Sequence, residues 1–160
     1  MDDQHFDLIL KKSFHYLSLR SRTEQEMRNY LQKKTEKYNF KPEIIDKVIE
    51  YLKERNFIND KDFVEEYISS RLKSKPRSLF LLKRELSQKG ISEENIETYL
   101  SENSVDEQAA AEKLLTRKSY TWANLPYLKK KKKTYDFLRT KGFNFDIIRL
   151  AFEKIFEGKS

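Results

Sequence analysis

The chain repeats a short phrase built around Lys-Gly. Residues 86–96 read LSQKGISEENI, and residues 138–148 read LRTKGFNFDII. The whole chain has three glycines in 160 residues, and two of them occur in this phrase. A third, degraded copy, NFKPEIIDKVI, begins at Asn39. A period of roughly fifty residues is typical of arrays of helical units, so this repeat constrains the fold more than any other feature of the sequence.

The repeated phrase has the residues that end a helix. A leucine closes an amphipathic helix before the turn of each copy: Leu31, Leu86 and Leu138. Glycine adopts the left-handed conformation at a helix C-terminus without steric cost, and asparagine is the next best residue there. We therefore predict that helices end at Asn39, Gly90 and Gly142. The hydrophobic residues that follow, at intervals of 51 and 52 residues, are Phe40, Ile91 and Phe143.

Signals for helix starts alternate with these stops. Ser, Thr, Asn and Asp side chains accept hydrogen bonds from the free amides of a first helical turn, and proline is tolerated at the first helical position. The predicted starts are Thr23 with Glu26 as a capping box, Pro42 after Lys41, Asn59 or Asp60, Ser92, Ser104 with Glu107 as a second capping box, and Asn144. No segment alternates as a strand would.

The predicted fold is therefore all-α, with three tandem three-helix repeats of the helix-turn-helix kind at residues 1–56, 57–103 and 104–160. Charged residues make up 37% of the chain and hydrophobic residues 38%. This composition suits an elongated, curved array with much surface better than a thick globular core. No exposed apolar stripe requires self-association, so we expect a monomer.

Several classes of chemistry are excluded by composition. The chain has no cysteine, which rules out disulfides and thiolate metal sites. Its two histidines, His5 and His15, are ten residues apart on one predicted helix, about 15 Å along the axis and too far to share a metal. No glycine-rich phosphate loop and no pairing of a nucleophile with a base is present. We expect no enzyme activity, no metal, no cofactor, no secretory signal and no membrane span, and hence a cytoplasmic protein.

Positive charge is concentrated toward the C-terminus. Residues 104–160 contain thirteen basic and seven acidic side chains, so they carry +6 of the net +7. Within residues 71–89 there are seven Lys or Arg and one Glu. If leucines mark the buried face of the helix there, Arg77 and Arg84 lie one above the other on the opposite side. This distribution predicts contact with an anionic partner.

The run YLKKKKKTYDFLRTKGF forms the second basic cluster. Its core side is predicted to contain Leu128, Tyr135 and Leu138. Its outward side is predicted to contain Lys129, Lys130 and Lys133. Lys131 and Lys132 are expected to flank the core and extend their ammonium groups to water. Such a run either forms a solvated helix face or contacts phosphates or acidic protein surfaces without reading sequence. Nearby Trp122 and Tyr120 could stack on bases, but we favour a packing role for Trp122.

Three stretches of the sequence resemble the RecX family of recombinase regulators. They read SRTEQEMRNYL, FINDKDFVEEYISSRLKSKPRSLFLLKRELSQKGIS and FLRTKGFNFDIIRLAF. The middle stretch is the most specific, with an Asn-Asp turn, a proline-basic connector and the Lys-Gly phrase in fixed order. The resemblance extends over nearly the whole chain, from about Phe6 to Phe156.

The resemblance implies a modulator of the RecA recombinase. Such a protein binds along the groove of the RecA filament on single-stranded DNA, and most simply inhibits its ATPase and strand exchange. A basic face would suit a groove that contains DNA and acidic loops. The predicted contact residues are Arg71, Lys73, Lys75, Arg77, Arg84, Lys129, Lys130, Lys133, Arg139 and Lys141.

Two alternatives remain open from the sequence. One is a general nucleic-acid-binding helical protein that binds single-stranded or duplex DNA without a recombinase. The other is a protein-interaction scaffold whose charge only keeps it in solution. A filament regulator should prefer recombinase-coated DNA to naked DNA, a plain DNA binder should not, and a scaffold should bind neither.

Overall fold

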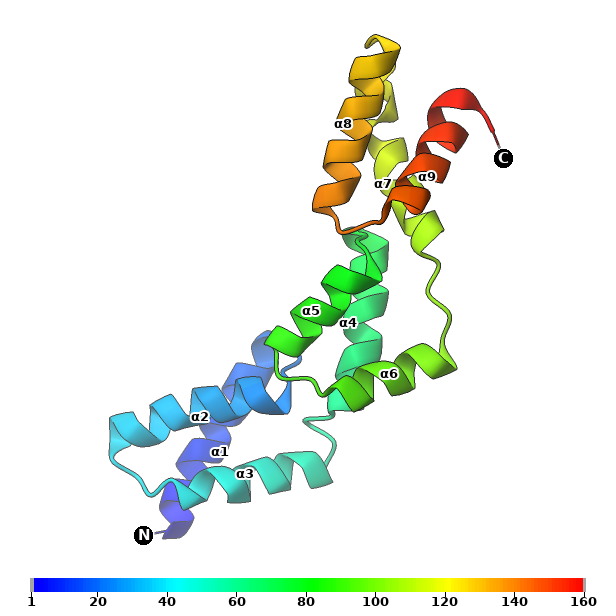
Figure 1. Cartoon of the computed structure of the whole chain (residues 1–160). Coiled ribbons are helices and arrows are strands. Elements are labelled where there is room, and N and C mark those ends of the chain that lie inside the picture. The colour runs from blue at the N-terminus through cyan, green and yellow to red at the C-terminus, as the bar shows by residue number, and fades with distance from the viewer. Residues whose placement is uncertain (1, 160) are drawn as a thin grey trace. The chain divides into compact units, whose positions relative to one another are not determined.

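The computed structural model describes residues 2–159 and, over that range, consists of nine helices with no strand. The helices are α1 (Asp2–Leu19), α2 (Glu24–Tyr38), α3 (Glu43–Glu54), α4 (Asp60–Ser74), α5 (Leu79–Gln88), α6 (Glu93–Glu102), α7 (Glu107–Trp122), α8 (Tyr127–Thr140) and α9 (Phe145–Glu157) (Figure 1). The predicted all-α class is confirmed.

The helices group into two compact units. Unit 1 combines the chain up to Glu65 with Leu86–Tyr99, and unit 2 combines Glu66–Glu85 with the chain from Leu100 onward. Helices α1 to α3 thus belong to unit 1, and α7 to α9 to unit 2. The repeat boundaries predicted from the sequence differ from these limits, because the middle repeat contributes to both units. Those boundaries stay a prediction.

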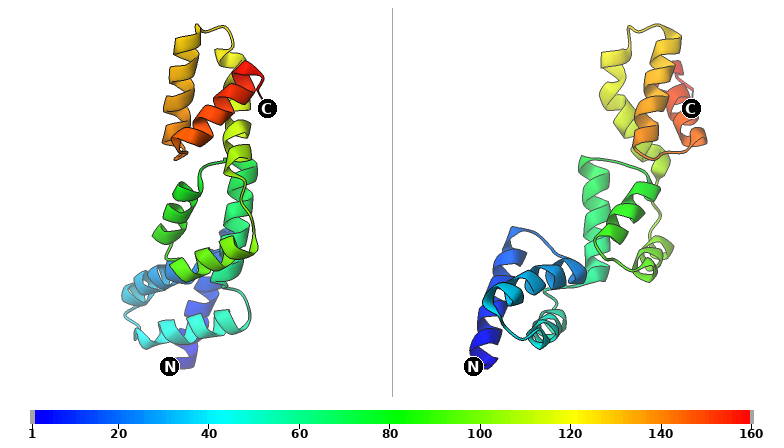
Figure 2. Two further views of the ribbon diagram at one scale, coloured as in Figure 1. Left: turned by 45° about the vertical axis from the view of Figure 1, so that its right-hand side comes forward. Right: turned by 60° about the vertical axis from the view of Figure 1, so that its left-hand side comes forward.

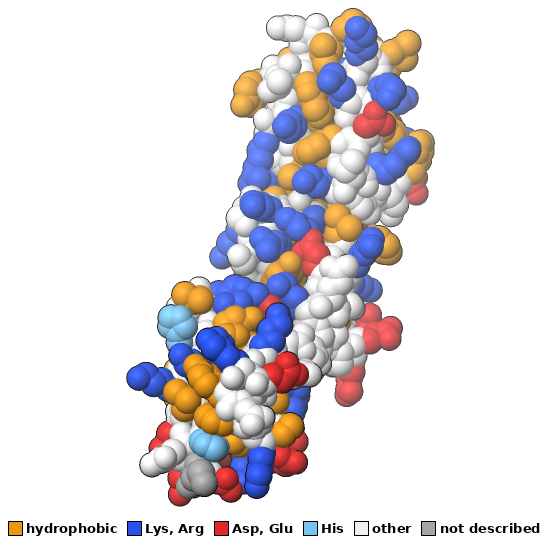
Figure 3. Space-filling model, turned by 90° about the vertical axis from the view of Figure 1, so that its left-hand side faces the viewer, with side chains coloured by type: hydrophobic (Ala, Val, Ile, Leu, Met, Phe, Trp, Pro, Cys, Tyr) orange, Lys and Arg blue, Asp and Glu red, His pale blue; other side chains and the backbone are white. Residues whose placement is uncertain are grey.

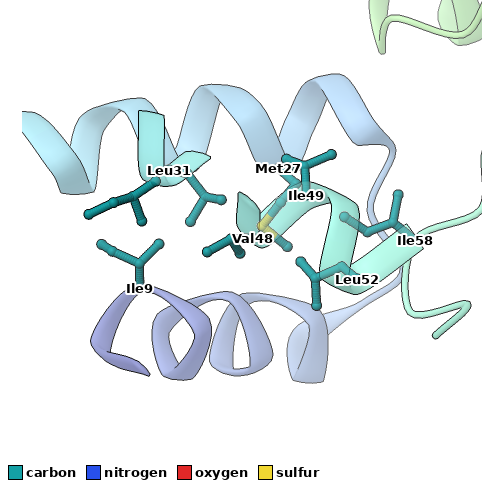
Figure 4. Packing of buried hydrophobic residues seen from close by; sticks show 8 residues of the cluster. Ile9, Met27, Leu31, Val48, Ile49, Leu52 and Ile58 are labelled. Carbon is teal, nitrogen blue, oxygen red and sulfur yellow. The ribbon is translucent and has the colours of Figure 1, made fainter. Parts of the chain in front are cut away.

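Unit 1 has a core made by one apolar face from each of its first three helices. Ile9 of α1, Met27 and Leu31 of α2, and Val48 and Leu52 of α3 are all fully buried. Figure 4 shows these side chains pointing toward one another from the three helices. Burial of an aliphatic side chain of this size contributes roughly 1.5–3 kcal/mol, so this cluster is the main stabilising feature of the unit.

Unit 2 has a second core, in which α7 packs along α9 and α8 (Figure 2). Small residues make the close approach possible, because Ala111 of α7 and Ala151 of α9 are both fully buried. Larger residues fill the remaining space: Leu114, Leu115, Leu138, Phe143 and Ile148. These residues of α7, α8 and α9, with Phe143 from the turn between α8 and α9, form the core of unit 2.

The first Lys-Gly turn contacts the start of α2. Gly90 has φ +83°, and a Cβ on it would lie 2.2 Å from Cβ of Gln25. The hydroxyl of Thr23 donates a hydrogen bond to the carbonyl of Lys89 at 2.6 Å. Glycine is therefore required twice at this position, for its backbone conformation and for the close approach of the neighbouring helix.

The second Lys-Gly turn repeats this arrangement at the start of α5. Gly142 has φ +85°, and a Cβ on it would lie 2.2 Å from Oγ of Ser78 and 2.8 Å from Cγ of Leu81. The amide of Ser78 donates a hydrogen bond to the carbonyl of Lys141 at 3.0 Å. The two phrases are thus more than helix stops, since each one also joins its repeat to the repeat before it.

Each of these joints includes a carboxylate from a third helix. The amide of Glu24, the first residue of α2, donates to Asp60 Oδ1 at 2.9 Å. The amide of Leu79, the first residue of α5, donates to Glu107 Oε1 at 2.8 Å. Asp60 and Glu107 are the first residues of α4 and α7. A carboxylate at a helix N-terminus satisfies a free amide and interacts favourably with the helix dipole.

The predicted helix starts are largely confirmed. Thr23 and Glu26 form the capping box. Asn59, Ser92 and Asn144 each accept a hydrogen bond from the amide three residues later. Pro42 has helical angles but lies one residue before α3.

The predicted capping box of Ser104 with Glu107 is wrong. Asp106 caps α7 by accepting from the amide of Ala109 at 3.0 Å. The Glu107 carboxylate cannot complete a box because it binds the amide of Leu79.

Candidate partner-binding surface

All ten basic residues predicted to contact a partner lie in unit 2. We call the first five the connector cluster: Arg71, Lys73, Lys75, Arg77 and Arg84. We call the second five the α8 cluster: Lys129, Lys130, Lys133, Arg139 and Lys141. Figure 3 shows Lys and Arg side chains interleaved with hydrophobic ones over the face that includes α8.

Two of the three arginines in the connector cluster, Arg71 and Arg77, interact with side chains between helices α4 and α5. Arg77 forms an ion pair with Glu85, and both side chains are less than a quarter exposed. The Tyr67 hydroxyl donates to the second oxygen of Glu85. The guanidinium of Arg71 lies 5.0 Å from the centre of the Tyr67 ring. These four groups form a partly buried polar network that connects α4 to α5.

The network changes the proton affinity of its acid. Burial by itself would raise the pKa of Glu85, but hydrogen bonds from Tyr67 and Arg77 outweigh burial and lower that pKa. The pKa of Tyr67 is raised, first by burial and then by its bond to the Glu85 carboxylate. The ionised carboxylate is therefore the form that the folded chain favours.

The predicted ridge of Arg77 above Arg84 is wrong. Arg77 precedes α5, and its Nε donates to the carbonyl of Lys75 at 3.0 Å, so it turns back toward the connector. Arg84 lies on α5 and is exposed, as are Lys73 and Lys75. The connector cluster thus presents three exposed cations, whereas Arg71 and Arg77 serve mainly to hold the unit together.

Two cations that were not predicted from the sequence lie beside this cluster. Lys113 Nζ donates to the carbonyl of Lys73 at 2.9 Å, and Arg117 Nη1 donates to the carbonyl of Ser74 at 3.2 Å. Both side chains come from α7 and bind the last carbonyls of α4, where cations are favoured by the helix dipole. The signal for them in the sequence is their spacing, because residues four apart lie on one face of a helix.

Helix α8 is rotated relative to the predicted orientation. Thr134 and Leu138 are fully buried, whereas Leu128, predicted in the core, is 77% exposed. Thr134 can lie inside because its hydroxyl donates to the carbonyl of Lys130 at 2.9 Å. Lys130, predicted to project outward, is half-buried, and its ammonium lies 5.0 Å from the centre of the Phe156 ring.

Aromatic rings lie beneath two other lysines of the α8 cluster. Lys133 Nζ is 6.0 Å from the Trp122 ring, and Lys141 Nζ is 5.8 Å from the Phe137 ring. Trp122 packs edge-on against Phe137, with ring centres 5.8 Å apart. The packing role favoured for Trp122 is confirmed, since its side chain is partly buried against the core of unit 2.

The described residues form no candidate metal site. No group of three or more His, Asp or Glu side chains across residues 2–159 is placed to hold a metal ion. His5 stacks on Phe40 with ring centres 3.8 Å apart. In the same range, none of the helices combines the length and the apolar character that crossing a membrane requires.

Fold and surface together define a tandem three-helix-repeat protein with two basic clusters in one unit. Sequence models of the three RecX domains match along the chain in order. The first three-helix domain matches residues 10–52, the second 59–100 and the third 106–152. The chain belongs to the RecX family, and the predicted architecture of three tandem three-helix units is confirmed.

Curated relatives carry the name Regulatory protein RecX. The protein from Streptococcus agalactiae is 32% identical over 142 residues, which cover 88% of this chain and 53% of the relative. The protein from Leuconostoc mesenteroides is 31% identical over 153 residues, which cover 95% of this chain and 57% of the relative. The chain therefore spans about half the length of the curated relatives it matches.

Solved structures show the same fold. The crystal structure of RecX from Lactobacillus salivarius matches with a TM-score of 0.77 at 24% identity, covering 96% of this chain and 97% of that one. A second crystal structure, of a regulatory protein RecX, matches with a TM-score of 0.71 at 21% identity, covering 96% and 73%.

Proposed function

We propose that this chain binds the filament that the RecA recombinase forms on single-stranded DNA and lowers its ATPase and strand-exchange activity. Membership of the RecX family supports this proposal, as does the name of the relatives as regulatory proteins. A regulator of this kind acts as a monomer in the cytoplasm, without a cofactor and without chemistry of its own.

One observation carries the electrostatic part of the proposal. Of the ten predicted contact residues, Lys73, Lys75, Arg84, Lys129, Lys133 and Arg139 are exposed in a single unit. Exposed Lys and Arg side chains attract phosphates and carboxylates without fixing a sequence, and the attraction weakens as salt is added. Binding in a groove that contains DNA and acidic loops is therefore expected to be strongly salt-dependent.

Inhibition would follow from occupancy. A protein that binds across neighbouring subunits of a filament opposes their rearrangement during ATP hydrolysis, because it binds one arrangement more tightly than the others. Each bound chain would affect several recombinase subunits, so the effect is expected at fewer chains than subunits.

The test is the ATPase rate of RecA on single-stranded DNA with this protein titrated in at a low and a high salt concentration. We expect the rate to fall at substoichiometric protein and the effect to weaken at high salt. A rate that does not change at either salt concentration would overturn the proposal.

A matched pair of variants separates the basic surface from net charge. The first variant replaces Lys129, Lys133 and Arg139 by Gln, and the control replaces three exposed lysines of unit 1, Lys33, Lys41 and Lys47, by Gln. Both lose three charges. Only the first is expected to weaken inhibition, and equal weakening would show that net charge alone is responsible.

A further inference from the structure

Helix α8 exposes a large apolar side chain, Leu128, while it buries a polar one, Thr134. Leu128 is 77% exposed and Phe145, at the start of α9, is 63% exposed, while Thr134 of α8 is fully buried and Lys130 is half-buried. Scattered exposed apolar residues are ordinary on a protein surface. Here, however, Leu128 and Phe145 lie next to each other, and neither belongs to the buried core of unit 2.

These exposed residues line a common groove. Leu128 and Tyr135 from α8 and Phe145 from α9 form its apolar surface, and Lys131 and Lys132 complete the lining, in a space of about 280 Å³. Tyr135 and Phe145 pack with ring centres 5.5 Å apart at an angle of 52°. A groove of this size is at the lower end of the ~300–1,000 Å³ range of small-molecule sites, and it is large enough for one large side chain.

The charges that line the groove are positive, and the carboxylates of Asp136 and Glu157 lie near them. The lining of the groove includes two lysines and no carboxylate. Lys131 Nζ lies 5.9 Å from the centre of the Tyr135 ring, and Lys132 Nζ lies 2.8 Å from Asp136 in an ion pair whose two side chains are both mostly exposed. A pair this exposed contributes little, so an incoming carboxylate can replace Asp136 at low cost.

We propose that the groove of Leu128, Lys131, Lys132, Tyr135 and Phe145 docks an acidic segment of a partner protein that carries one large apolar side chain. The apolar side chain would lie between Leu128 and Phe145, and flanking carboxylates would bind Lys131 and Lys132. This inference does not depend on the partner being the recombinase, and none of the five residues belongs to the connector or α8 cluster.

The geometry favours a protein segment over nucleic acid. Bases bind single-strand binding proteins by stacking on open aromatic faces. In this groove Leu128 is aliphatic and offers no ring on which a base could stack. The rings of Tyr135 and Phe145 are tilted against each other, so they are not set apart to receive a base. An aliphatic and aromatic surface with a polar border is instead the usual anatomy of a protein contact.

The test is an NMR titration of the ¹⁵N-labelled full chain with two pools of short random peptides. The first pool contains Asp, Glu, Leu, Phe and Ser, and the second has Ala in place of Leu and Phe. We expect the first pool to shift the amide signals of Leu128, Tyr135 and Phe145 and the second to leave them unchanged. Equal shifts from both pools, or no shift with either, would overturn the proposal.

Variants provide the matched controls. Leu128→Ser with Phe145→Ser is expected to weaken binding of the first pool at least about tenfold. Lys131→Glu with Lys132→Glu should do the same with the apolar surface intact. Phe80→Ser, at a residue of unit 2 that is 65% exposed, should leave binding unchanged. A Phe80 variant that binds as weakly as the double Ser variant would contradict the assignment.

A third arm tests nucleic acid directly with single-stranded oligothymidylate. We expect the oligonucleotide to shift the amide signals of Lys129, Lys133 and Arg139. If it shifts the groove signals instead, and Leu128→Ser with Phe145→Ser abolishes those shifts, the groove is a nucleic-acid site and the proposal of a protein segment is wrong.

Discussion

The connector cluster and the α8 cluster have the same number of basic residues but use them differently. In the connector cluster, Arg71 and Arg77 surround Glu85 and Tyr67 in a partly buried network. In the α8 cluster, Lys129, Lys133 and Arg139 are exposed. Two residues of the first cluster therefore stabilise unit 2, while each cluster also presents three exposed cations, which in the first are Lys73, Lys75 and Arg84.

The internal role of Arg71 and Arg77 fits the chemistry of the arginine side chain. Arginine has a planar, weakly hydrated guanidinium with several donors, which suits an internal pair with a carboxylate. Lysine is a strongly hydrated point charge that stays in water unless its stem is covered. The number of basic residues in a stretch of sequence thus does not show how many of them are free to contact a partner. Variants of the two clusters can separate the stabilising role from the binding role.

The largest expected effect is at the joint that links the two clusters. Gly142→Ala would place a methyl group against the buried Ser78 hydroxyl, in a backbone conformation that alanine disfavours. We expect a decrease of about 3 kcal/mol in unfolding free energy, from backbone strain and overpacking together, measured by urea denaturation. Gly158 has φ +67° and open space around it. Gly158→Ala should lower the unfolding free energy by only about 1 kcal/mol. Equal decreases for the two variants would contradict the close packing of Gly142 against Ser78.

The next effect concerns the connector network. Glu85→Ala would leave Arg77 and Tyr67 without their common acceptor in a partly buried site, and we expect a decrease of about 2 kcal/mol in unfolding free energy. The control is Asp136→Ala, which breaks the exposed pair with Lys132 in α8 and should leave the thermal midpoint unchanged. Similar midpoints for the two variants would show that the connector network does not stabilise the fold.

A smaller effect should appear on changing the pH. The pKa of Glu85 is lower in the folded chain than its ordinary value. Folding therefore favours the ionised form, which adds stability above pH ~4.3, the usual value for an unfolded Glu, and this stability disappears as the pH falls through the folded pKa. The wild type should exceed Glu85→Gln in unfolding free energy at pH 7, and the difference should shrink toward pH 3. If the difference in unfolding free energy between the two proteins does not depend on pH, Glu85 is not stabilised in its ionised form by the network.

The smallest effect on stability is expected in the α8 cluster. Replacing Lys129, Lys133 and Arg139 by Gln should leave the thermal midpoint almost unchanged, since these side chains are exposed. The salt dependence of binding to the filament should decrease by about 1 in logarithmic slope for each phosphate that the variant no longer neutralises. A large fall in the midpoint would mean that this cluster, too, is structural.

Much of the fold was predictable because its signals are local. Gly90 and Gly142 end helices, and Thr23, Asn59, Ser92 and Asn144 begin them. These effects depend on a few neighbouring residues, so a repeated phrase is enough to identify them. The packing of the two Lys-Gly turns against Gln25 and Ser78 was not predictable, since it depends on residues far away in the sequence.

The errors have a common physical origin. Glu107 has the sequence of a capping box, but its carboxylate binds an amide of another helix. Leu128 has the hydropathy of a core residue, but Thr134 takes the inward position because its hydroxyl is satisfied by the backbone. Arg77 was assigned to a helix face but binds Glu85. In each case a specific hydrogen bond or ion pair outweighed the preference read from the sequence, and the candidate site was affected more than the fold.

The most direct test of the account is the affinity of this protein for fluorescently labelled single-stranded DNA with and without bound RecA, measured by anisotropy at one salt concentration. We predict binding at least about tenfold tighter to the RecA-coated DNA, a difference of roughly 1.4 kcal/mol. We also predict that the affinity for the RecA-coated DNA falls when Lys129, Lys133 and Arg139 are replaced by Gln. Equal affinity for coated and naked DNA would contradict the proposed function and identify a plain nucleic-acid binder.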